Sequence, residues 1–297
     1  MRRLFALVLL CSSLAFAGTP TGQLTKFSTT WNGLPRYYAV YVPKVPQAAP
    51  ALVLFLHATS ANASTNPPYY NQEPWELLAD QYGFIMVWPV SSYNHRAGEW
   101  YWDCFFMDFS FPVHPDDVGF VRSVITNVAA AHSVDPNRVF VTGMSSGGFM
   151  THRLGAEASD LVAAIAPVSA QVDVEQAGNT FVLPPILAPI SVLDMHGDRD
   201  NTVPYCGAAS KTYWGEPALI VPSLDDTARY WRTQNSCSDS VPRLCTKGFA
   251  TKGVFGLDAV SCNNGVEVKF VREVGIGHEW VPGTETTVWS FFQKHAR

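Results

Sequence analysis

The amino-acid sequence predicts an α/β protein with a mostly parallel central sheet flanked by helices. From residue 51 onward, short apolar runs alternate with amphipathic stretches, which is the order of elements in β-α-β units. The chain has 297 residues, of which 47% are hydrophobic and 15% are charged. This composition can bury a large core and excludes disordered and low-complexity proteins. No repeat, linker or compositional break divides the chain, so we predict a single domain.

The apolar runs predict the strands, because each run is short and bounded by polar or turn-forming residues. In chain order, the predicted core strands are Ala51–His57, Phe84–Pro89, Arg138–Thr142, Leu161–Val168, Ile190–His196 and Val266–Arg272. An earlier segment, Tyr37–Val42, lies between prolines. We predict that it is an edge strand on an antiparallel hairpin.

The intervening stretches predict the helices that cover the sheet. They are Trp75–Tyr82, Val118–His132, Gly147–Ala158, Leu224–Asn235 and Glu285–His295. In the second of these, branched apolar residues recur at i, i+3, i+7 and i+10, which predicts one apolar face against the sheet. Either Asp116 or Asp117 can cap the N-terminus of that helix.

The first 17 residues have the pattern of a secretory signal peptide. Arg2 and Arg3 precede an apolar run, and Ala15-Phe16-Ala17 supplies small residues where a signal peptidase cleaves. The apolar stretch is interrupted at Cys11 and is shorter than the roughly 18 to 20 residues that a membrane span needs. We therefore predict that residues 1–17 are removed, that residues 18–297 form the mature domain, and that the protein is secreted or periplasmic.

Charge excludes one class of partner. The chain has a formal net charge of −5 and no run rich in lysine or arginine, so it lacks the electrostatic footprint of a nucleic-acid-binding protein. No stretch after the signal peptide is apolar enough to span a bilayer. We expect a monomer that binds neither nucleic acid nor membrane.

A candidate nucleophile lies in the segment Gly143-Met144-Ser145-Ser146-Gly147-Gly148, between a predicted strand and a predicted helix. This is the setting of a nucleophile elbow, in which a tight turn exposes a serine hydroxyl at the carboxyl end of a sheet. Bulky residues at positions 143 and 147 would collide with neighbouring elements. The helix N-terminus beside Ser145 favours developing negative charge.

A nucleophilic serine needs an imidazole to take its proton and a carboxylate to orient that imidazole. After the strand Ile190–His196, a polar loop contains Asp200, which we predict is the acid, with Asp198 as the alternative. After the last core strand, a loop flanked by glycines contains His278, which we predict is the base. The chain order Ser, Asp, His is the one expected for a nucleophile elbow.

The tetrahedral intermediate of acyl transfer needs hydrogen-bond donors aimed at its oxyanion. The first predicted donor is the backbone N–H of Ser146, the residue after the nucleophile. The second should come from the loop after Ala51–His57, and the N–H of Thr59 is the preferred group. We interpret the His57 side chain as a packing residue that shapes this loop.

Removal of the signal peptide would leave five cysteines, namely Cys104, Cys206, Cys237, Cys245 and Cys262. An odd number in an oxidising compartment predicts one leftover thiol. A Cys237–Cys262 disulfide would pin a segment without obvious core periodicity, whereas Cys237–Cys245 would close a shorter loop. The sequence alone leaves both open. No pair has the C-x-x-C spacing of a zinc site, and no metal is predicted.

Several motifs match a known family. They are Asp116-Asp117-Val118-Gly119-Phe120, the run from Val134 to Ser145, His196-Gly197 followed by Asp200 and Val203-Pro204-Tyr205, and Gly277-His278. In these motifs, the chain from about residue 35 to residue 295 resembles secreted esterases of the polyhydroxybutyrate depolymerase type. These esterases are related to feruloyl and acetylxylan esterases and are similar to carbohydrate esterase family 1.

The resemblance implies an α/β-hydrolase fold and an acid three positions after the His-Gly pair, which is Asp200. It also favours the Cys237–Cys262 disulfide, because the cysteine after the corresponding helix usually pairs with one just before the last core strand. Two segments depart from the family pattern: His57-Ala58 stands where relatives have His-Gly, and Gly98–Cys104 replaces a Trp-Asn-Ala-Gly-x-Cys-Cys motif. The second departure leaves the substrate open.

Aromatic residues concentrate between positions 93 and 111 without helical or strand periodicity. They are Tyr93, Trp100, Tyr101, Trp102, Phe105, Phe106, Phe109 and Phe111. Loops that leave strands at their carboxyl ends surround the site in open α/β sheets, so this segment could form an apolar wall for substrate. It could equally form a small satellite core held by Cys104. Trp100 and Trp102 are candidate substrate contacts, and Trp280, close to His278, is a stronger one.

Together these features predict a cofactor-free serine carboxylic ester hydrolase that works through an acyl-enzyme. Within the resemblance, the substrate is a polyester such as polyhydroxybutyrate, or a feruloyl or acetyl ester on a polysaccharide. A catalytically silent binding protein with the same fold is the alternative from a different class. A peptidase also stays open, because acyl-transfer machinery is shared and fold alone does not determine substrate.

Overall fold

The computed structural model describes residues 18–60, 62, 64, 67–69, 72–95, 98–104, 114–172, 174–176, 179–209, 220–238, 244–245, 253–262 and 265–297. The predicted signal peptide, the aromatic residues Phe105 to Phe111 and parts of several surface segments lie outside these residues.

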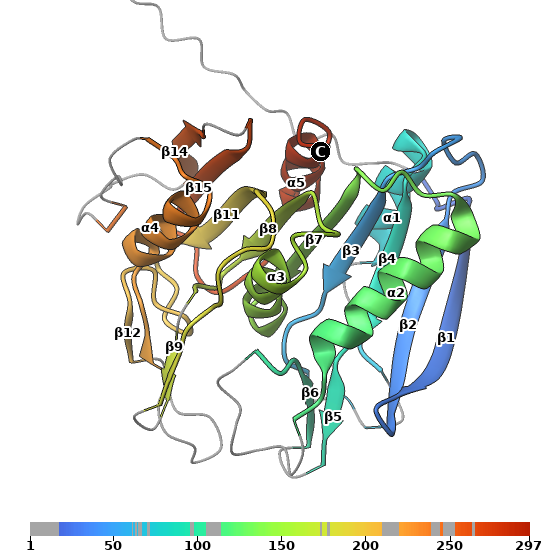
Figure 1. Ribbon diagram of the computed structural model, residues 1–297, viewed down its shortest axis with the longest axis horizontal. Coiled ribbons are helices and arrows are strands. Elements are labelled where there is room, and N and C mark those ends of the chain that lie inside the picture. The colour runs from blue at the N-terminus through green and yellow to red at the C-terminus, as the bar shows by residue number, and fades with distance from the viewer. Residues whose placement is uncertain are drawn as a thin grey trace, which may run out of the picture.

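A nine-stranded sheet runs through the middle of the molecule (Figure 1). Its order is β1-β2-β4-β3-β7-β8-β11-β15-β14. The bounds of these strands are Gln23–Trp31 (β1), Leu34–Val42 (β2), Ile85–Val90 (β4), Leu52–Leu56 (β3), Val139–Met144 (β7), Ala164–Val168 (β8), Ser191–Gly197 (β11), Glu267–Val274 (β15) and Gly253–Ser261 (β14). The run from β4 to β15 is parallel throughout, and antiparallel strands flank it at both ends.

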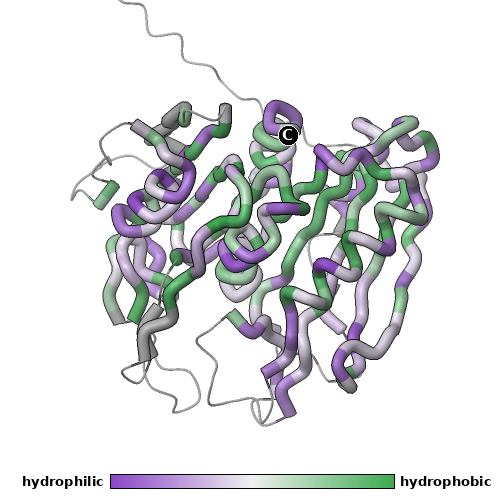
Figure 2. The backbone as a smooth tube through the Cα atoms, in the orientation of Figure 1, coloured by the Kyte–Doolittle hydropathy of each residue, from purple (hydrophilic) through white to green (hydrophobic). Residues whose placement is uncertain are grey.

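The six predicted core strands are confirmed as β3, β4, β7, β8, β11 and β15. Strands β3, β4 and β11 are buried along their whole length because helices cover both faces of the sheet. The central strands are correspondingly the most hydrophobic part of the backbone trace (Figure 2).

At the margins of the sheet, the antiparallel hairpin is confirmed, but one expectation was wrong and one strand was missed. The predicted edge strand Tyr37–Val42 lies within β2, which pairs with β1 on one side and β4 on the other, so β1 is the edge. Strand β14 was not predicted. It pairs antiparallel with β15 and closes the opposite margin of the sheet.

Among the described residues, five helices pack on the sheet, and all match predicted segments within three residues at each end. They are α1 (Gln72–Tyr82), α2 (Asp117–His132), α3 (Ser146–Glu157), α4 (Leu224–Gln234) and α5 (Thr284–Phe292). Residues of α2, α3 and α4 share one core cluster, and residues of α1 and α5 share the other, so the two groups cover opposite faces (Figure 1). At the start of α2, Asp116 is the cap, and its carboxylate accepts a hydrogen bond from the Gly119 N–H.

Two smaller sheets lie beside the main one. Strands β5 (Ser92–Asn94) and β6 (Glu99–Tyr101) form an antiparallel hairpin directly after β4. The other small sheet has the order β10-β9-β13-β12, with bounds Asn179–Phe181, Val174–Gln176, Ile220–Val221 and Ala208–Ala209. Neither sheet was predicted, because strands of two or three residues carry too little hydrophobic pattern to be recognised.

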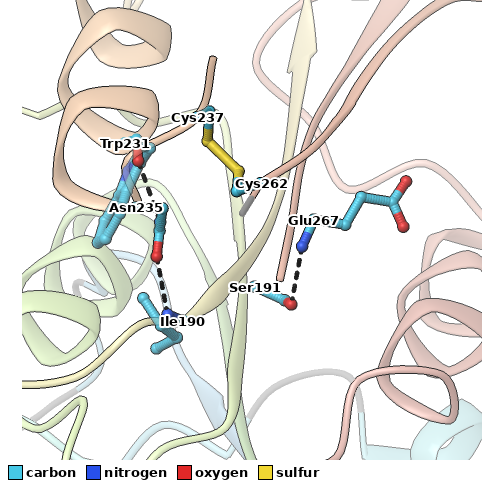
Figure 3. Close-up of a disulfide and its surroundings, with 7 residues drawn as sticks. All are labelled: Ile190, Ser191, Trp231, Asn235, Cys237, Cys262 and Glu267. Carbon is cyan, nitrogen blue, oxygen red and sulfur yellow. Dashed lines mark hydrogen bonds between the residues drawn. A yellow bond between two sulfur atoms is a disulfide. The ribbon is translucent and has the colours of Figure 1, made fainter. Parts of the chain in front are cut away.

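A disulfide joins Cys237, just after α4, to Cys262, just after β14 (Figure 3). The pairing that the resemblance favoured is therefore confirmed. Nearby, the Asn235 side chain accepts a hydrogen bond from the Ile190 N–H and donates one to the Trp231 carbonyl. These bonds and the disulfide together fix the end of α4 against the entrance to β11.

Candidate active site

Ser145 occupies a sharp turn between β7 and α3. Its φ of 54° and ψ of −121° are unfavourable for a residue with a side chain. The Ser145 N–H donates to the Val168 carbonyl at the end of the neighbouring strand, at 3.0 Å. The Ser145 carbonyl accepts from the Phe149 N–H in the first turn of α3. This is the geometry of a nucleophile elbow, and it is held from both sides.

The glycines beside Ser145 are required by close backbone contacts. A Cβ atom on Gly143 would lie 2.6 Å from the Gly147 carbonyl oxygen and 2.7 Å from that of Leu56. A Cβ atom on Gly147 would collide with the carbonyl oxygens of Leu56 and His57. Side chains are therefore excluded at both positions, as the sequence predicts.

We expect Gly147→Ala to lower the free energy of unfolding by about 3 kcal/mol, because backbone atoms must move to admit the methyl group. Urea denaturation followed by circular dichroism would measure the change. The matched control is Gly277→Ala, whose Cβ would have only the Arg199 carbonyl at 4.0 Å nearby. Equal stability of the two variants would contradict the close packing of the elbow.

Asp200 and His278 meet beside the carboxyl ends of β11 and β15. The His278 Nδ1 and the Asp200 Oδ2 are 2.7 Å apart. Both strands are parallel to β7, with only β8 between β7 and β11, so their loops emerge at the same sheet edge as Ser145. The structure thus brings the predicted acid and base into contact and places the predicted nucleophile at that edge.

The Asp200 carboxylate is surrounded by donors. Its Oδ1 accepts hydrogen bonds from the Thr202 and Val203 N–H groups, each at 2.8 Å. Burial by itself would raise the pKa of Asp200, but hydrogen bonds from His196 and His278 outweigh burial and hold the pKa well below its ordinary value. Asp200 is therefore a fixed negative charge beside the imidazole of His278.

Asp198, the alternative acid, has a different position. Its Oδ2 accepts from the Arg272 guanidinium at 2.9 Å, and its Oδ1 accepts from the Gly275 N–H at 2.7 Å. These bonds hold the start of the loop that delivers His278. Asp198 therefore supports the loop, whereas Asp200 contacts the imidazole.

The loop after β3, which contains Thr59, is braced on both sides. The Trp102 indole donates to the His57 carbonyl at 3.0 Å. Ser60 and Trp100 exchange two backbone hydrogen bonds at 2.9 and 2.8 Å. Thr59 lies between these anchored points, and Ser146 is the first residue of α3. Their N–H groups stay the predicted oxyanion donors.

The prediction that Trp100 and Trp102 contact the substrate needs correction. Trp100 is 1% exposed and Trp102 is 0% exposed, so neither ring offers a surface to a ligand. The Trp100 ring packs between Tyr37 and Tyr93, and Trp102 packs against His57. The described part of the aromatic segment is thus a satellite core whose effect on the site is to support the Thr59 loop.

The contacts of His57 define its protonation. The Ser91 N–H donates to the His57 Nε2 at 3.0 Å, so the ring proton is on Nδ1, which donates to the Ala58 carbonyl at 2.6 Å. Burial lowers the pKa of His57 to about 4, and the charge of Arg36 acts in the same direction. A neutral His57 shapes the loop, as the sequence interpretation holds.

This lowered pKa gives a pH-dependent stability. Below about pH 6.5 the unfolded chain gains a proton at His57, whereas the folded chain gains it only near pH 4. Stability contributed by the neutral ring is therefore complete above pH 6.5 and falls by about 3 kcal/mol as the pH drops to 4. Urea titrations at several pH values should show this fall in the free energy of unfolding for wild type and not for His57→Gln. The matched control is His95→Gln, which removes an imidazole from an exposed position.

Trp280 is partly buried two residues after His278. Its ring packs edge-on against Phe55 at 5.1 Å and near Trp75 at 6.5 Å, and its indole donates to Glu285 at 3.3 Å. The inner part of the ring thus belongs to the core on the α1 and α5 face. Its contact with substrate stays a prediction.

Two site residues were missed from the sequence. The His196 Nε2 lies 3.4 Å from the Asp200 Oδ2 and 2.8 Å from the Val203 carbonyl, so a second histidine flanks the acid. Near His196, the buried Glu273 has its pKa raised to about 7 by burial, a shift that the charge of His196 partly opposes. The His196-Gly197 pair was a usable signal for the first, but nothing in the local sequence marks Glu273.

The order of the parallel strands, the serine elbow after β7 and the Asp-His contact beyond β11 and β15 define the α/β-hydrolase class. A family model described as "Esterase PHB depolymerase" matches residues 36–239, which is more than half of the chain. The chain therefore belongs to the polyhydroxybutyrate depolymerase family of esterases.

The curated relatives that match include fungal esterases. A probable acetylxylan esterase A of Neosartorya fischeri is 32% identical over 142 residues, covering 48% of this chain and 36% of the relative. Feruloyl esterase B of Piromyces equi is 28% identical over 179 residues, covering 60% and 31%. The chain thus spans only about a third of the length of these relatives.

A solved structure supports the fold over nearly the whole chain. The acetyl xylan esterase from Aspergillus awamori has a TM-score of 0.60, with 92% of this chain and 99% of that chain covered at 18% identity. At this identity the likeness concerns the fold. No helix in the described part of the chain is long and apolar enough to cross a bilayer.

Proposed function

We propose that this protein is a serine carboxylic ester hydrolase with Ser145, Asp200 and His278 as its catalytic triad. The observation that carries the proposal is the 2.7 Å contact between His278 and Asp200 at the sheet edge where the strained Ser145 turn lies. A serine in an elbow, an imidazole and a buried carboxylate are the three groups that acyl transfer requires.

In the proposed mechanism, His278 removes the proton of Ser145 as the serine oxygen attacks the ester carbonyl. Asp200 holds the proton on Nδ1 and thereby leaves Nε2 free to accept. The N–H groups of Ser146 and Thr59 stabilise the oxyanion. The imidazolium then protonates the leaving alcohol, and water hydrolyses the acyl-enzyme with the same histidine as base. No cofactor takes part.

Esters carried by polymers are the proposed substrates. The relatives are named acetylxylan and feruloyl esterases, and the family is named for depolymerisation of polyhydroxybutyrate. Acetyl or feruloyl esters on a polysaccharide and a polyester are therefore the candidates. An incubation with acetylated xylan, methyl ferulate and a polyhydroxybutyrate suspension should release acetate, ferulate or soluble hydroxyacid from one class in preference to the others.

Labelling by a fluorophosphonate tests the mechanism independently of substrate choice. The reagent reacts only with an activated serine, so we expect one adduct, on Ser145, and none in Ser145→Ala. A folded wild-type protein that takes up no reagent would instead be a binding protein with a hydrolase fold.

We also propose that the enzyme is exported and that cleavage follows Ala17. The charged and apolar regions of residues 1–17 and the disulfide between Cys237 and Cys262 support this proposal. N-terminal sequencing of the protein recovered outside the cytoplasm should begin at Gly18. An intact Met1 on exported protein would refute the cleavage.

A further inference from the structure

Two cysteines outside the triad lie together at the end of the Asp200 loop. Cys206 is exposed, Cys245 is partly buried, and neither is disulfide-bonded. The Cys206 thiol lies within hydrogen-bonding reach of the Cys245 thiol. The two residues are far apart in the sequence, so the fold itself creates this contact.

Both cysteines are held there by bonds around the start of α4. The Tyr205 carbonyl accepts from the Leu224 N–H at 3.1 Å and from the Cys245 thiol at 3.7 Å. The Asp225 carboxylate accepts from the backbone N–H groups of Leu244 and Cys245. The two thiols are therefore neighbours because their backbones are anchored to the same helical turn.

We propose that Cys206 and Cys245 form a second disulfide when the protein meets a disulfide-bearing oxidant, such as oxidised glutathione or a thiol–disulfide oxidoreductase. The thiolate of Cys206 attacks the oxidant disulfide, forms a mixed disulfide and releases one thiol of the oxidant. The thiolate of Cys245 then attacks the Cys206 sulfur, and the second oxidant thiol leaves. Two protein thiols are oxidised, and one disulfide of the oxidant is reduced to two thiols.

Exposure sets the order of these steps. Cys206 is accessible to the oxidant, whereas burial, together with the hydrogen bond and charge of the Cys206 thiol, raises the pKa of Cys245 to about 12. Once Cys206 is in the mixed disulfide, its thiol no longer opposes ionisation of Cys245. Burial still raises the pKa of Cys245, so its position beside the residue that precedes Cys206, rather than a low pKa, favours it for the second attack.

The new bond would tie the acid loop to the rest of the molecule. The Tyr205 ring packs edge-on against His196 at 5.7 Å and lies under the Arg272 guanidinium at 5.4 Å. A Cys206–Cys245 bond would fix this loop near the start of α4, while the disulfide of Figure 3 fixes the chain after its end.

The number of cysteines agrees with the proposal. Five cysteines lie among the described residues, and a second disulfide leaves only Cys104. Cys104 is buried, and burial raises its pKa well above the ordinary value, so it is a poor partner for exchange. One leftover thiol is what an odd count predicts.

Disulfide mapping of the wild-type chain tests the proposal without any assay of activity. Purified protein is incubated with oxidised glutathione, denatured in iodoacetamide without reductant, digested and analysed by mass spectrometry. We expect a joined peptide containing Cys206 and Cys245, with alkylation at Cys104. Alkylation of both Cys206 and Cys245 would overturn the proposal, whatever the outcome for the ester hydrolase.

A stability measurement gives a second readout. In the oxidised protein, Cys245→Ser should lower the midpoint of thermal unfolding by about 5 °C, because the closed loop no longer restricts the unfolded chain. The matched control Cys104→Ser should retain the joined peptide. In dithiothreitol, wild type and Cys245→Ser should unfold together. A difference of the same size under reducing conditions would assign the effect to packing and contradict the disulfide.

Discussion

Replacing Ser145 by alanine should lower kcat for a p-nitrophenyl ester by about 10⁶-fold, because the variant cannot form the acyl-enzyme. Folding should be retained, since the elbow is held by its backbone bonds and by the glycines on either side. Loss of the Cβ hydroxyl removes no hydrogen bond of the scaffold that the described residues provide. The residual rate should approach that supplied by binding and the oxyanion donors alone.

The control for Ser145→Ala is the same substitution at a serine outside the proposed active site. Ser290 is exposed on α5, and its hydroxyl donates to the Thr286 carbonyl within the same helix. We expect Ser290→Ala to keep the wild-type kcat. Burst kinetics of p-nitrophenol release would separate acylation from deacylation. If Ser145→Ala kept activity within tenfold of wild type, a different nucleophile would have to carry the reaction.

The sequence predicted the centre of the sheet better than its margins. Strands β3, β4 and β11 are apolar runs buried on both faces, so the local hydrophobic pattern is enough to predict them. Strand β1 is mostly exposed and rich in threonine and serine, and it is a strand because β2 pairs with it along its whole length. A strand that depends on its partner strand in this way is difficult to predict from the hydrophobic pattern of its own residues.

The same distinction applies to the site. The positions of Ser145, Asp200 and His278 at one edge of the sheet could be predicted because each lies just beyond the carboxyl end of a strand, in the chain order of the fold. The burial of Trp100 and Trp102 could not, because it depends on the β5–β6 hairpin and its backbone bridge to Ser60. The sequence shows that these residues are aromatic, but whether their rings are buried depends on the tertiary structure.

Chain order left Asp198 as an alternative to Asp200, which the family resemblance favoured, and side-chain direction distinguishes the two in the structure. Both lie in one turn, and both follow the same strand by a few residues. The Asp198 carboxylate accepts hydrogen bonds from the Gly275 N–H and the Arg272 guanidinium. The carboxylate that contacts His278 is that of Asp200. Chain order therefore locates the acid loop, and hydrogen bonding selects the residue within it.

Because Asp200 is the carboxylate that contacts His278, its replacement should also cause a large loss of activity. Asp200→Asn should lower kcat by about 10⁴-fold while leaving KM within a few fold of wild type. The new side chain can still accept from the Thr202 and Val203 N–H groups through its carbonyl oxygen. Its amide group then faces His278 and donates to Nδ1. The imidazole proton is forced onto Nε2, which can no longer accept the proton of Ser145.

Asp198→Asn is the matched variant, because it makes the same chemical change two residues away. It weakens the ion pair with Arg272 and the bond to the Gly275 N–H, so some loosening of the His278 loop is expected. The resulting loss in kcat should stay within about tenfold, since His278 retains its carboxylate. Steady-state kinetics of both variants on one ester would compare them directly. A larger loss in Asp198→Asn than in Asp200→Asn would transfer the acid role to Asp198, because only the group that fixes the imidazole tautomer can control proton transfer from Ser145.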